Sequence, residues 1–327
     1  MPRFQSLTRQ LGRAGIGLLC LAAFWFGAGF TSDVRAQTVA AAGREPFRAG
    51  ETYYGRRQFT EYLAGDLPVI IAAPHGGREK PEDLPDRLKG TFAFDTNTQE
   101  LAREIAAAFH ERTGRHAHVV ICRLHRWKVD CNREAEEGAG GHPLALQAWE
   151  DFQGFLDRAR TAVTNGFGGG LFIDLHGHGH KEQRLELGYL HTPETLARAD
   201  AELNAAEFVQ ESSLRGLALK TKAPYAELLR GPRSLGALLE AEGFPCAPSP
   251  REPRPVAPYF SGGYNTRRHG RDAGPVGGLQ METNFKGVRD TAESREQFAR
   301  ALVRAVEAWL KEHQGIALPV KAAAGAG

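Results

Sequence analysis

Cysteine is scarce in this chain of 327 residues, which has four cysteines and no Cys-x-x-Cys pair. This scarcity excludes a disulfide-rich scaffold and a Cys/His zinc finger, because both require closely spaced cysteines. Only Cys122, Cys131 and Cys246 follow the N-terminal region, and an odd number of thiols cannot all form disulfides. Cys122 lies within an apolar run and is therefore predicted to be a buried thiol.

An excess of charge of either sign is also missing, since 41 Lys and Arg stand against 39 Asp and Glu. This balance argues against a nucleic-acid-binding protein and against a membrane-surface binder. The sequence has no internal repeat and no Gly-x-Ser-x-Gly motif, which makes a serine hydrolase with a nucleophile elbow a poor candidate.

No apolar run is long enough to indicate a membrane span with confidence, because the stretch 16–30 has only 15 residues. Three arginines precede this stretch, and small residues at 34 and 36 suit a cleavage site. Residues 1–36 are thus predicted to be a signal peptide, with an uncleaved anchor as the alternative. We expect an exported protein, periplasmic or secreted, without a stable membrane span after cleavage.

The remaining chain is predicted to be one α/β domain, a three-layer sandwich with a central mixed, largely parallel sheet. Residues 37–50 are predicted to be loose, 51–315 to form the single domain, and 316–327 to be a disordered tail. Apolar and turn patterns predict further elements, namely a hairpin over 53–64, helices over 98–112 and from Pro143, a strand over 116–124, helices within 193–243, and a last helix capped by Ser294.

Four short apolar runs each lead to a group of polar residues, and this is the most informative pattern in the chain. Such runs are typical of buried strands in a parallel sheet, whose ligands bind outside the carboxyl ends of the strands. The polar groups that follow these runs are Pro74-His75-Gly76-Gly77, Asp130-Cys131-Asn132-Arg133, Asp174-Leu175-His176-Gly177-His178 and Glu282.

His75 and His176 are the candidate metal ligands, because a catalytic metal site combines neutral imidazoles with a carboxylate and leaves one position for water. Two carboxylates are candidates for the third ligand. Glu79 stands four residues after His75, and Asp95 stands just before the next predicted helix. Nitrogen and oxygen ligands favour zinc over other divalent metals. The nearby His178 and His180 could instead belong to a solvated histidine run on an exposed loop.

Glu282 is the candidate general base, since a carboxylate facing an activated water can accept its proton. Arg133, with Asn132 beside it, is the candidate anchor for a substrate carboxylate, because a guanidinium binds a carboxylate through two parallel hydrogen bonds. The alternative for Arg133 is a structural salt bridge, and that for Glu282 is a surface residue at a strand end. Tyr264 is a candidate substrate-binding residue, and further candidate cations are Arg126, Arg267 and Arg268.

Taken in order, these motifs resemble the N-formylglutamate amidohydrolase family, which is related in fold to the zinc carboxypeptidases and aspartoacylases. The resemblance covers most of residues 67–290. It rests on the Pro-His-Gly-Gly segment at 74–77 with Pro81, Asp95 with Thr98, the Asp-Cys-Asn-Arg segment at 130–133, Asp174-Leu175-His176, the segment 260–270, and Leu279-Gln280-Met281-Glu282.

The resemblance implies a phosphorylase/hydrolase-like α/β fold with a zinc site, an Asn132–Arg133 pair that receives the substrate carboxylate, and a water-activating Glu282. Carboxypeptidases and aspartoacylases use a His-x-x-Glu ligand pair, but Arg78 stands three residues after His75. Formylglutamate-type sequences also lack that glutamate, so the resemblance favours Asp95 as the third ligand.

The expected protein is therefore a zinc-dependent amidohydrolase acting on a small N-acyl amino acid or peptide with a carboxylate. One alternative is a carboxypeptidase or cell-wall peptidase on the same scaffold. Another is an exported metal- or solute-binding protein without enzymatic activity. The sequence leaves the substrate and the oligomeric state open.

Overall fold

The computed structural model describes residues 47–272 and 274–321, which belong to one compact unit. The predicted signal peptide lies outside the described residues, as does most of the predicted loose segment. Within the described ranges, no helix combines the length and apolar character that crossing a membrane requires. The three cysteines of the described residues are free and buried.

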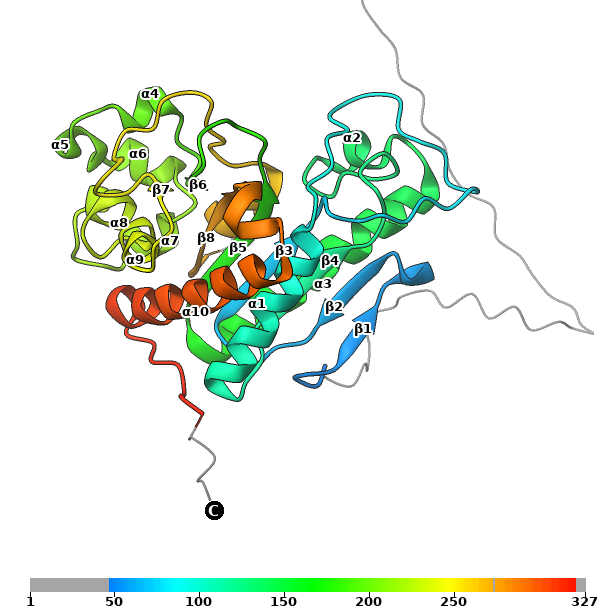
Figure 1. The fold of residues 1–327 in the computed structure, drawn as a ribbon, viewed down its shortest axis with the longest axis horizontal. Coiled ribbons are helices and arrows are strands. Elements are labelled where there is room, and N and C mark those ends of the chain that lie inside the picture. The colour runs from blue at the N-terminus through cyan, green and yellow to red at the C-terminus, as the bar shows by residue number, and fades with distance from the viewer. Residues whose placement is uncertain (1–46, 273, 322–327) are drawn as a thin grey trace, which may run out of the picture. The chain divides into compact units, whose positions relative to one another are not determined.

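A mixed sheet of eight strands runs through the centre of the described residues (Figure 1). Its strand order is β1-β2-β4-β3-β5-β8-β6-β7. The central pairs β4/β3, β3/β5 and β5/β8 are parallel, whereas β8/β6 is antiparallel. The strands are β1 (Thr52–Tyr54), β2 (Thr60–Leu63), β3 (Val69–Ala73), β4 (His118–Cys122), β5 (Gly170–Gly177), β6 (Leu185–Gly188), β7 (Cys246–Ala247) and β8 (Val276–Thr283). The predicted three-layer α/β architecture with a largely parallel sheet is confirmed.

Helices cover both faces of the sheet, with α1 and α10 on one face and α3 on the other (Figure 1). The helices are α1 (Thr98–Thr113), α2 (Ala135–Ala139), α3 (Pro143–Phe167), α4 (Pro193–Leu196), α5 (Asp200–Leu203), α6 (Ala206–Glu211), α7 (Arg215–Ala218), α8 (Tyr225–Arg230), α9 (Leu235–Ala241) and α10 (Ala292–Gln314), with short 3₁₀ or π turns η1 (Arg56–Gln58), η2 (Thr266–Arg271) and η3 (Phe285–Arg289).

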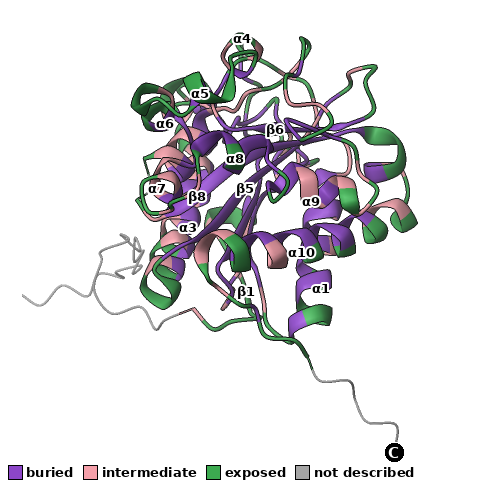
Figure 2. Ribbon diagram, turned by 90° about the vertical axis from the view of Figure 1, so that its left-hand side faces the viewer, coloured by how far each residue is buried: buried purple, intermediate pink, exposed green. Residues whose placement is uncertain are grey.

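Strand β3 shows why its sequence is apolar without alternation. Val69 and Ile71 pack with the core on the α1/α10 side, whereas Ile70 and Ala72 pack with the core on the α3 side. All of these side chains are buried, and Figure 2 draws the central strands β5 and β8 mostly in the purple of buried residues. Burial of each larger aliphatic side chain stabilises the fold by about 1.5–3 kcal/mol.

The ends of the long helices follow local capping chemistry. His142 caps α3 before a proline at the first helical position, and Gly114 ends α1 with a φ of 71°. The prediction that Ser294 caps the last helix is wrong. Helix α10 begins at Ala292, and the side chain of Thr291 accepts a hydrogen bond from the Ser294 N–H at 3.1 Å.

The described part of the predicted C-terminal tail packs against the domain. The Ile316 N–H donates to the Leu310 carbonyl, and the Lys321 N–H donates to the Arg112 carbonyl at the end of α1. Leu318 is buried beside these contacts. Residues 322–327 of that prediction lie outside the described residues.

Candidate metal and substrate site

The polar groups predicted at strand ends line one cavity of about 440 Å³. His75 follows β3, His176 stands near the end of β5, and Glu282 stands near the end of β8. Asp95 enters from the residues before α1, and the segment after β4 supplies Arg126, Asn132 and Arg133. The carboxyl ends of neighbouring parallel strands therefore bring together residues that are far apart in the sequence.

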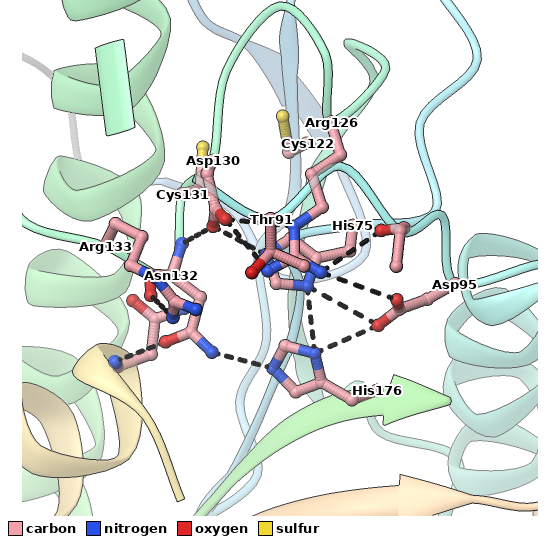
Figure 3. Close-up of polar contacts among 12 residues, drawn as sticks. His75, Thr91, Asp95, Cys122, Arg126, Asp130, Cys131, Asn132, Arg133 and His176 are labelled. Atoms are coloured by element: carbon pink, nitrogen blue, oxygen red, sulfur yellow. Dashed lines mark hydrogen bonds and ion pairs between the residues drawn. The ribbon is translucent and has the colours of Figure 1, made fainter. Parts of the chain in front are cut away.

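Three buried ligand atoms converge at the centre of this cavity (Figure 3). The Nδ1 atoms of His75 and His176 are 3.1 Å apart, and Asp95 Oδ2 lies 3.5 Å from the first and 3.0 Å from the second. Ligands bound tetrahedrally to zinc at about 2.0–2.2 Å are about 3.3–3.6 Å from one another. The separations of these three atoms, here called the ligand triangle, are within about 0.3 Å of that range, so small side-chain shifts would accommodate such an ion.

His75 is oriented by a carboxylate behind its ring. Its Nε2 lies 2.7 Å from Oδ1 of Asp130, a fully buried residue whose other oxygen, Oδ2, accepts a hydrogen bond from Arg126 Nε at 2.9 Å. Burial alone would raise the pKa of Asp130, but His75, Arg126 and Arg133 outweigh it and hold that pKa well below its usual range. The ionised carboxylate can only accept, so Nε2 of His75 donates, and the tautomer with its proton on Nε2 has the lone pair of Nδ1 facing the ligand triangle.

His176 has a second carboxylate behind it, but two groups approach its Nε2. Asp174 Oδ2 and Asn132 Nδ2 each lie 3.1 Å from this nitrogen. Asp174 Oδ2 is buried without a hydrogen-bond partner in the described residues, so it gains more from a proton on Nε2 than the Asn132 amide does. This pairing gives both histidines the carboxylate–histidine arrangement that commonly supports metal ligands.

The charges around the ligand triangle favour a cation. Burial alone would raise the pKa of Asp95, but the hydrogen bonds to His176 and His75 outweigh it and lower that pKa. Burial alone would likewise lower the pKa of His176, but Asp174, Asp95 and Glu282 outweigh it and raise that pKa well above its usual value. A proton on His176 therefore compensates the buried carboxylates, and a divalent ion could take its place.

The two glycines after His75 are required by close backbone packing. A Cβ on Gly77 would lie 2.1 Å from the Leu124 carbonyl oxygen, and one on Gly76 would lie 2.4 Å from Thr98 Oγ1. The Pro-His-Gly-Gly segment thus passes tightly between the start of α1 and the segment after β4. This close approach positions His75 beside Asp130.

Glu282 shares the cavity with the ligand triangle and is held by Gln280, whose Nε2 donates to Glu282 Oε1 at 2.9 Å. Glu282 is the direct register partner of His176 across the β5/β8 pair. Burial, reinforced by the nearby carboxylates of Asp95 and Glu186, raises the pKa of Glu282 to about 8. A cation on the triangle would oppose these negative charges and favour the carboxylate form that a base requires.

Arg289 ties three site segments together through their backbone carbonyl oxygens. Its guanidinium donates to Thr283 O at 3.2 Å, to His178 O at 3.1 Å, and to Thr96 O. These carbonyls follow Glu282, His176 and Asp95 by one or two residues. Gly177 leaves room for the guanidinium, since a Cβ there would lie 2.2 Å from Arg289 Cζ.

Asn132 and Arg133 both line the cavity, but they differ in how firmly they are held. Asn132 Oδ1 accepts a hydrogen bond from the Asn265 N–H at 2.8 Å, which fixes the amide next to His176. Arg133 is half-buried, donates to the Asn132 carbonyl at 2.9 Å and lies 3.3 Å from the exposed Glu137. An exposed partner of this kind can be exchanged for a substrate carboxylate.

Several other predicted candidates lie away from the ligand triangle or the cavity wall. Glu79 forms an ion pair with Arg123 at 2.6 Å, and Arg268 pairs with Asp157 at 2.8 Å. Tyr264 is buried against Trp149, its hydroxyl accepts from Arg268, and it does not line the cavity. Of the two remaining predicted cations, Arg267 lies near Glu134 and does not line the cavity. Arg126 does line the cavity, where it forms an ion pair with Asp130.

The orienting roles of Asp130 and Asp174 were not predicted from the sequence, although both lie within the recognised motifs. Asp174 carried a usable signal, because residues two apart on a strand face the same side of a sheet, and His176 is two residues further on. Asp130 carried no such signal, since its contact with His75 depends on the path of the segment after β4.

Comparison with known proteins gives distant structural matches. No family model matches the sequence, and no curated protein matches it. Solved structures similar to this chain include the N-formylglutamate amidohydrolase from Ralstonia eutropha JMP134, at 14% identity and a TM-score of 0.45, covering 77% of this chain and 96% of the other. A gene product from Agrobacterium tumefaciens is similar at 14% identity and a TM-score of 0.44, covering 78% and 96%. A shared fold does not determine function, which depends on the side chains of the site.

Proposed function

We propose that this protein is an exported, zinc-dependent amidohydrolase that cleaves the amide bond of a small, carboxylate-bearing N-acyl amino acid or peptide. The ligand triangle of His75, Asp95 and His176 carries the proposal. Two Nδ1 atoms and a carboxylate oxygen converge within 3.0–3.5 Å, with a carboxylate behind each ring. Residues paired in this way are costly to bury unless a cation or a proton compensates their charge.

A divalent ion bound there would polarise a substrate carbonyl and make water a stronger nucleophile near neutral pH. Glu282, buried next to His176 in the sheet, is the group placed to take a proton from the attacking water and to give it to the leaving amine. Gln280 keeps the carboxylate of Glu282 oriented for this transfer. His75 and His176 remain fixed by Asp130 and Asp174 throughout.

Arg133 would bind the substrate carboxylate, with the Asn132 amide beside it. Its exposed partner Glu137 stabilises the free side chain only weakly, because exposed ion pairs contribute about 0–1 kcal/mol. A substrate carboxylate in the half-buried cavity can therefore replace it. Arg126 is less suited to this role, because its Nε and Nη2 already bind the buried Asp130.

The deciding experiment combines zinc analysis with hydrolysis of N-formyl, N-acetyl and peptidyl derivatives of glutamate. We expect one zinc per chain, hydrolysis of at least one derivative, and a loss of kcat of about 100-fold or more in Glu282→Gln with zinc retained. Preferred cleavage of longer peptides would favour the peptidase alternative on the same site. Tight zinc binding without hydrolysis of any amide would instead indicate a binding protein and refute the proposal.

A further inference from the structure

A third histidine in the cavity is paired with a buried carboxylate but does not belong to the ligand triangle. His180 lies in the loop between β5 and β6, and its Nδ1 lies 2.8 Å from Oε1 of Glu186 on β6. Glu186 is fully buried, and its other oxygen accepts the Phe260 N–H at 2.8 Å. The guanidinium of Arg184 lies 3.7 Å from the same Oε1.

This pairing determines which nitrogen of His180 is available to a ligand. In the tautomer that donates from Nδ1 to Glu186, Nε2 of His180 keeps its lone pair and faces away from that carboxylate. No described residue pairs with this Nε2, and the side chain keeps 16% of its surface exposed. Phe260 stacks on the His180 ring with centroids 4.8 Å apart, and both residues line the cavity.

The neighbouring His178 is arranged differently, although His178, His180 and Glu186 are close enough to suggest a second metal site. Its Nδ1 accepts the His180 N–H at 3.1 Å, and its Nε2 bonds to the Arg184 carbonyl at 2.8 Å. Both nitrogens are therefore occupied in holding the loop. A metal would have to break one of these buried hydrogen bonds, so the cluster favours an oriented acceptor at His180 over a second cation.

The sheet register gives the position of this acceptor relative to the ligand triangle. His176 pairs with Glu282, and Glu282 pairs with Glu186, so the three residues form one row across β5, β8 and β6. Two strand spacings of about 4.8 Å place the backbone of Glu186, whose side chain binds His180, about 10 Å from the backbone of His176. That distance is too long for direct proton transfer, but an extended peptide spans it with about three residues.

We propose that His180, oriented by Glu186 and stacked on Phe260, forms a subsite for the acyl portion of a peptide-like substrate. Nε2 of His180 would accept a hydrogen bond from an amide N–H about three residues from the scissile bond, and Phe260 would contact the adjoining apolar part. The assignment of the acyl side rests on the proposed function. The proposed carboxylate anchor Arg133 follows β4, which lies on the other side of β5 from β8 and β6 in the strand order.

The test uses a matched pair of probes that differ by one hydrogen-bond donor. Acetyl-trialanyl-glutamate is compared with its depsipeptide, in which an ester oxygen replaces the outermost amide N–H. Binding of both to zinc-loaded Glu282→Gln is measured by titration calorimetry, which does not require turnover. We expect the amide to bind about fivefold to tenfold more tightly, and the preference to vanish when His180→Phe is added, which keeps a stacking ring.

A histidine outside the cavity supplies the matched control, since His110→Phe on the exposed surface of α1 should keep the preference. Equal binding of both probes to the Glu282→Gln protein would overturn the subsite. Loss of a second zinc ion per chain in His180→Phe would also overturn it, in favour of a metal site. Hydrolysis by the wild-type protein is measured separately. A preference for the amide probe that depends on His180, found without any hydrolysis, would support the subsite and refute only the proposed amidohydrolase function.

Discussion

Replacing Asp130 by asparagine tests whether the carboxylates behind the histidines prepare the site for a metal. The substitution keeps the size of the side chain but removes the charge that accepts Nε2–H of His75 at 2.7 Å. The asparagine amide can present an N–H to that nitrogen, which would move the ring proton to Nδ1 and into the ligand triangle. Loss of such a supporting group weakens metal binding by about 10–100-fold, or about 1.4–2.7 kcal/mol.

The assay is a competition for zinc against a chromophoric chelator at fixed pH. Asp130→Asn also leaves Arg126 without its buried partner, which could destabilise the fold by about 3–5 kcal/mol. The unfolding free energy of the metal-free variant is therefore measured in parallel, and only protein that is folded under the assay conditions is compared. Asp174→Asn repeats the test at the other histidine with a different set of neighbours.

Glu79→Gln is the control, because it removes a carboxylate that lies outside the ligand triangle and pairs with Arg123. Its zinc affinity should match that of the wild-type protein. A folded Asp130→Asn protein whose zinc affinity stays within about twofold of the control would refute the orienting role. The ligand triangle would then have to be explained without its supporting carboxylates.

Three further predictions concern the carboxylate that completes the metal site, the arginine that anchors the substrate, and the stability of the folded protein at acidic pH. Asp95→Ala should lose most bound zinc, whereas Glu79→Ala should keep it; elemental analysis showing equal zinc in both would contradict the ligand triangle. Arg133→Lys should lower kcat/KM by about 10–1000-fold for a carboxylate substrate but not for its amidated analogue, and equal losses would argue against the anchor. Burial lowers the pKa of His118 to about 4. Since the unfolded chain takes up that proton first, stability should fall by up to roughly 3 kcal/mol between about pH 6.5 and 4, and His118→Gln should reduce this slope in urea unfolding.

The sequence predicts the fold well, because the apolar runs of β3, β4, β5 and β8 have the length and continuity of buried parallel strands. The same reasoning predicts that His75 and His176 lie close together, since parallel strands end at one edge of the sheet. This reasoning does not decide whether Glu79 or Asp95 is the third metal ligand, and only the family resemblance favours Asp95. Only the path of the chain after His75 places Asp95 in the ligand triangle.

Sequence patterns could not predict the side-chain contacts made by residues in loops. Tyr264 stands in a motif next to the site, yet its ring lies against Trp149 and its hydroxyl accepts a hydrogen bond from Arg268. The pairing of His180 with Glu186 joins a loop to a strand, and no periodicity encodes it. The cap of α10 depended on which of two neighbouring hydroxyl residues adopts the extended backbone, and Thr291 does.

The three hydrogen bonds that Arg289 donates to backbone carbonyls have a consequence for the energetics of ligand binding at the site. Because of these hydrogen bonds, the segments that hold Asp95, His176 and Glu282 lose their freedom of movement when the chain folds. A metal or substrate that arrives later finds the ligands already immobilised and does not have to order them. Affinity at this site is therefore set by desolvation and by the chemistry of the ligands, with little conformational entropy left to lose.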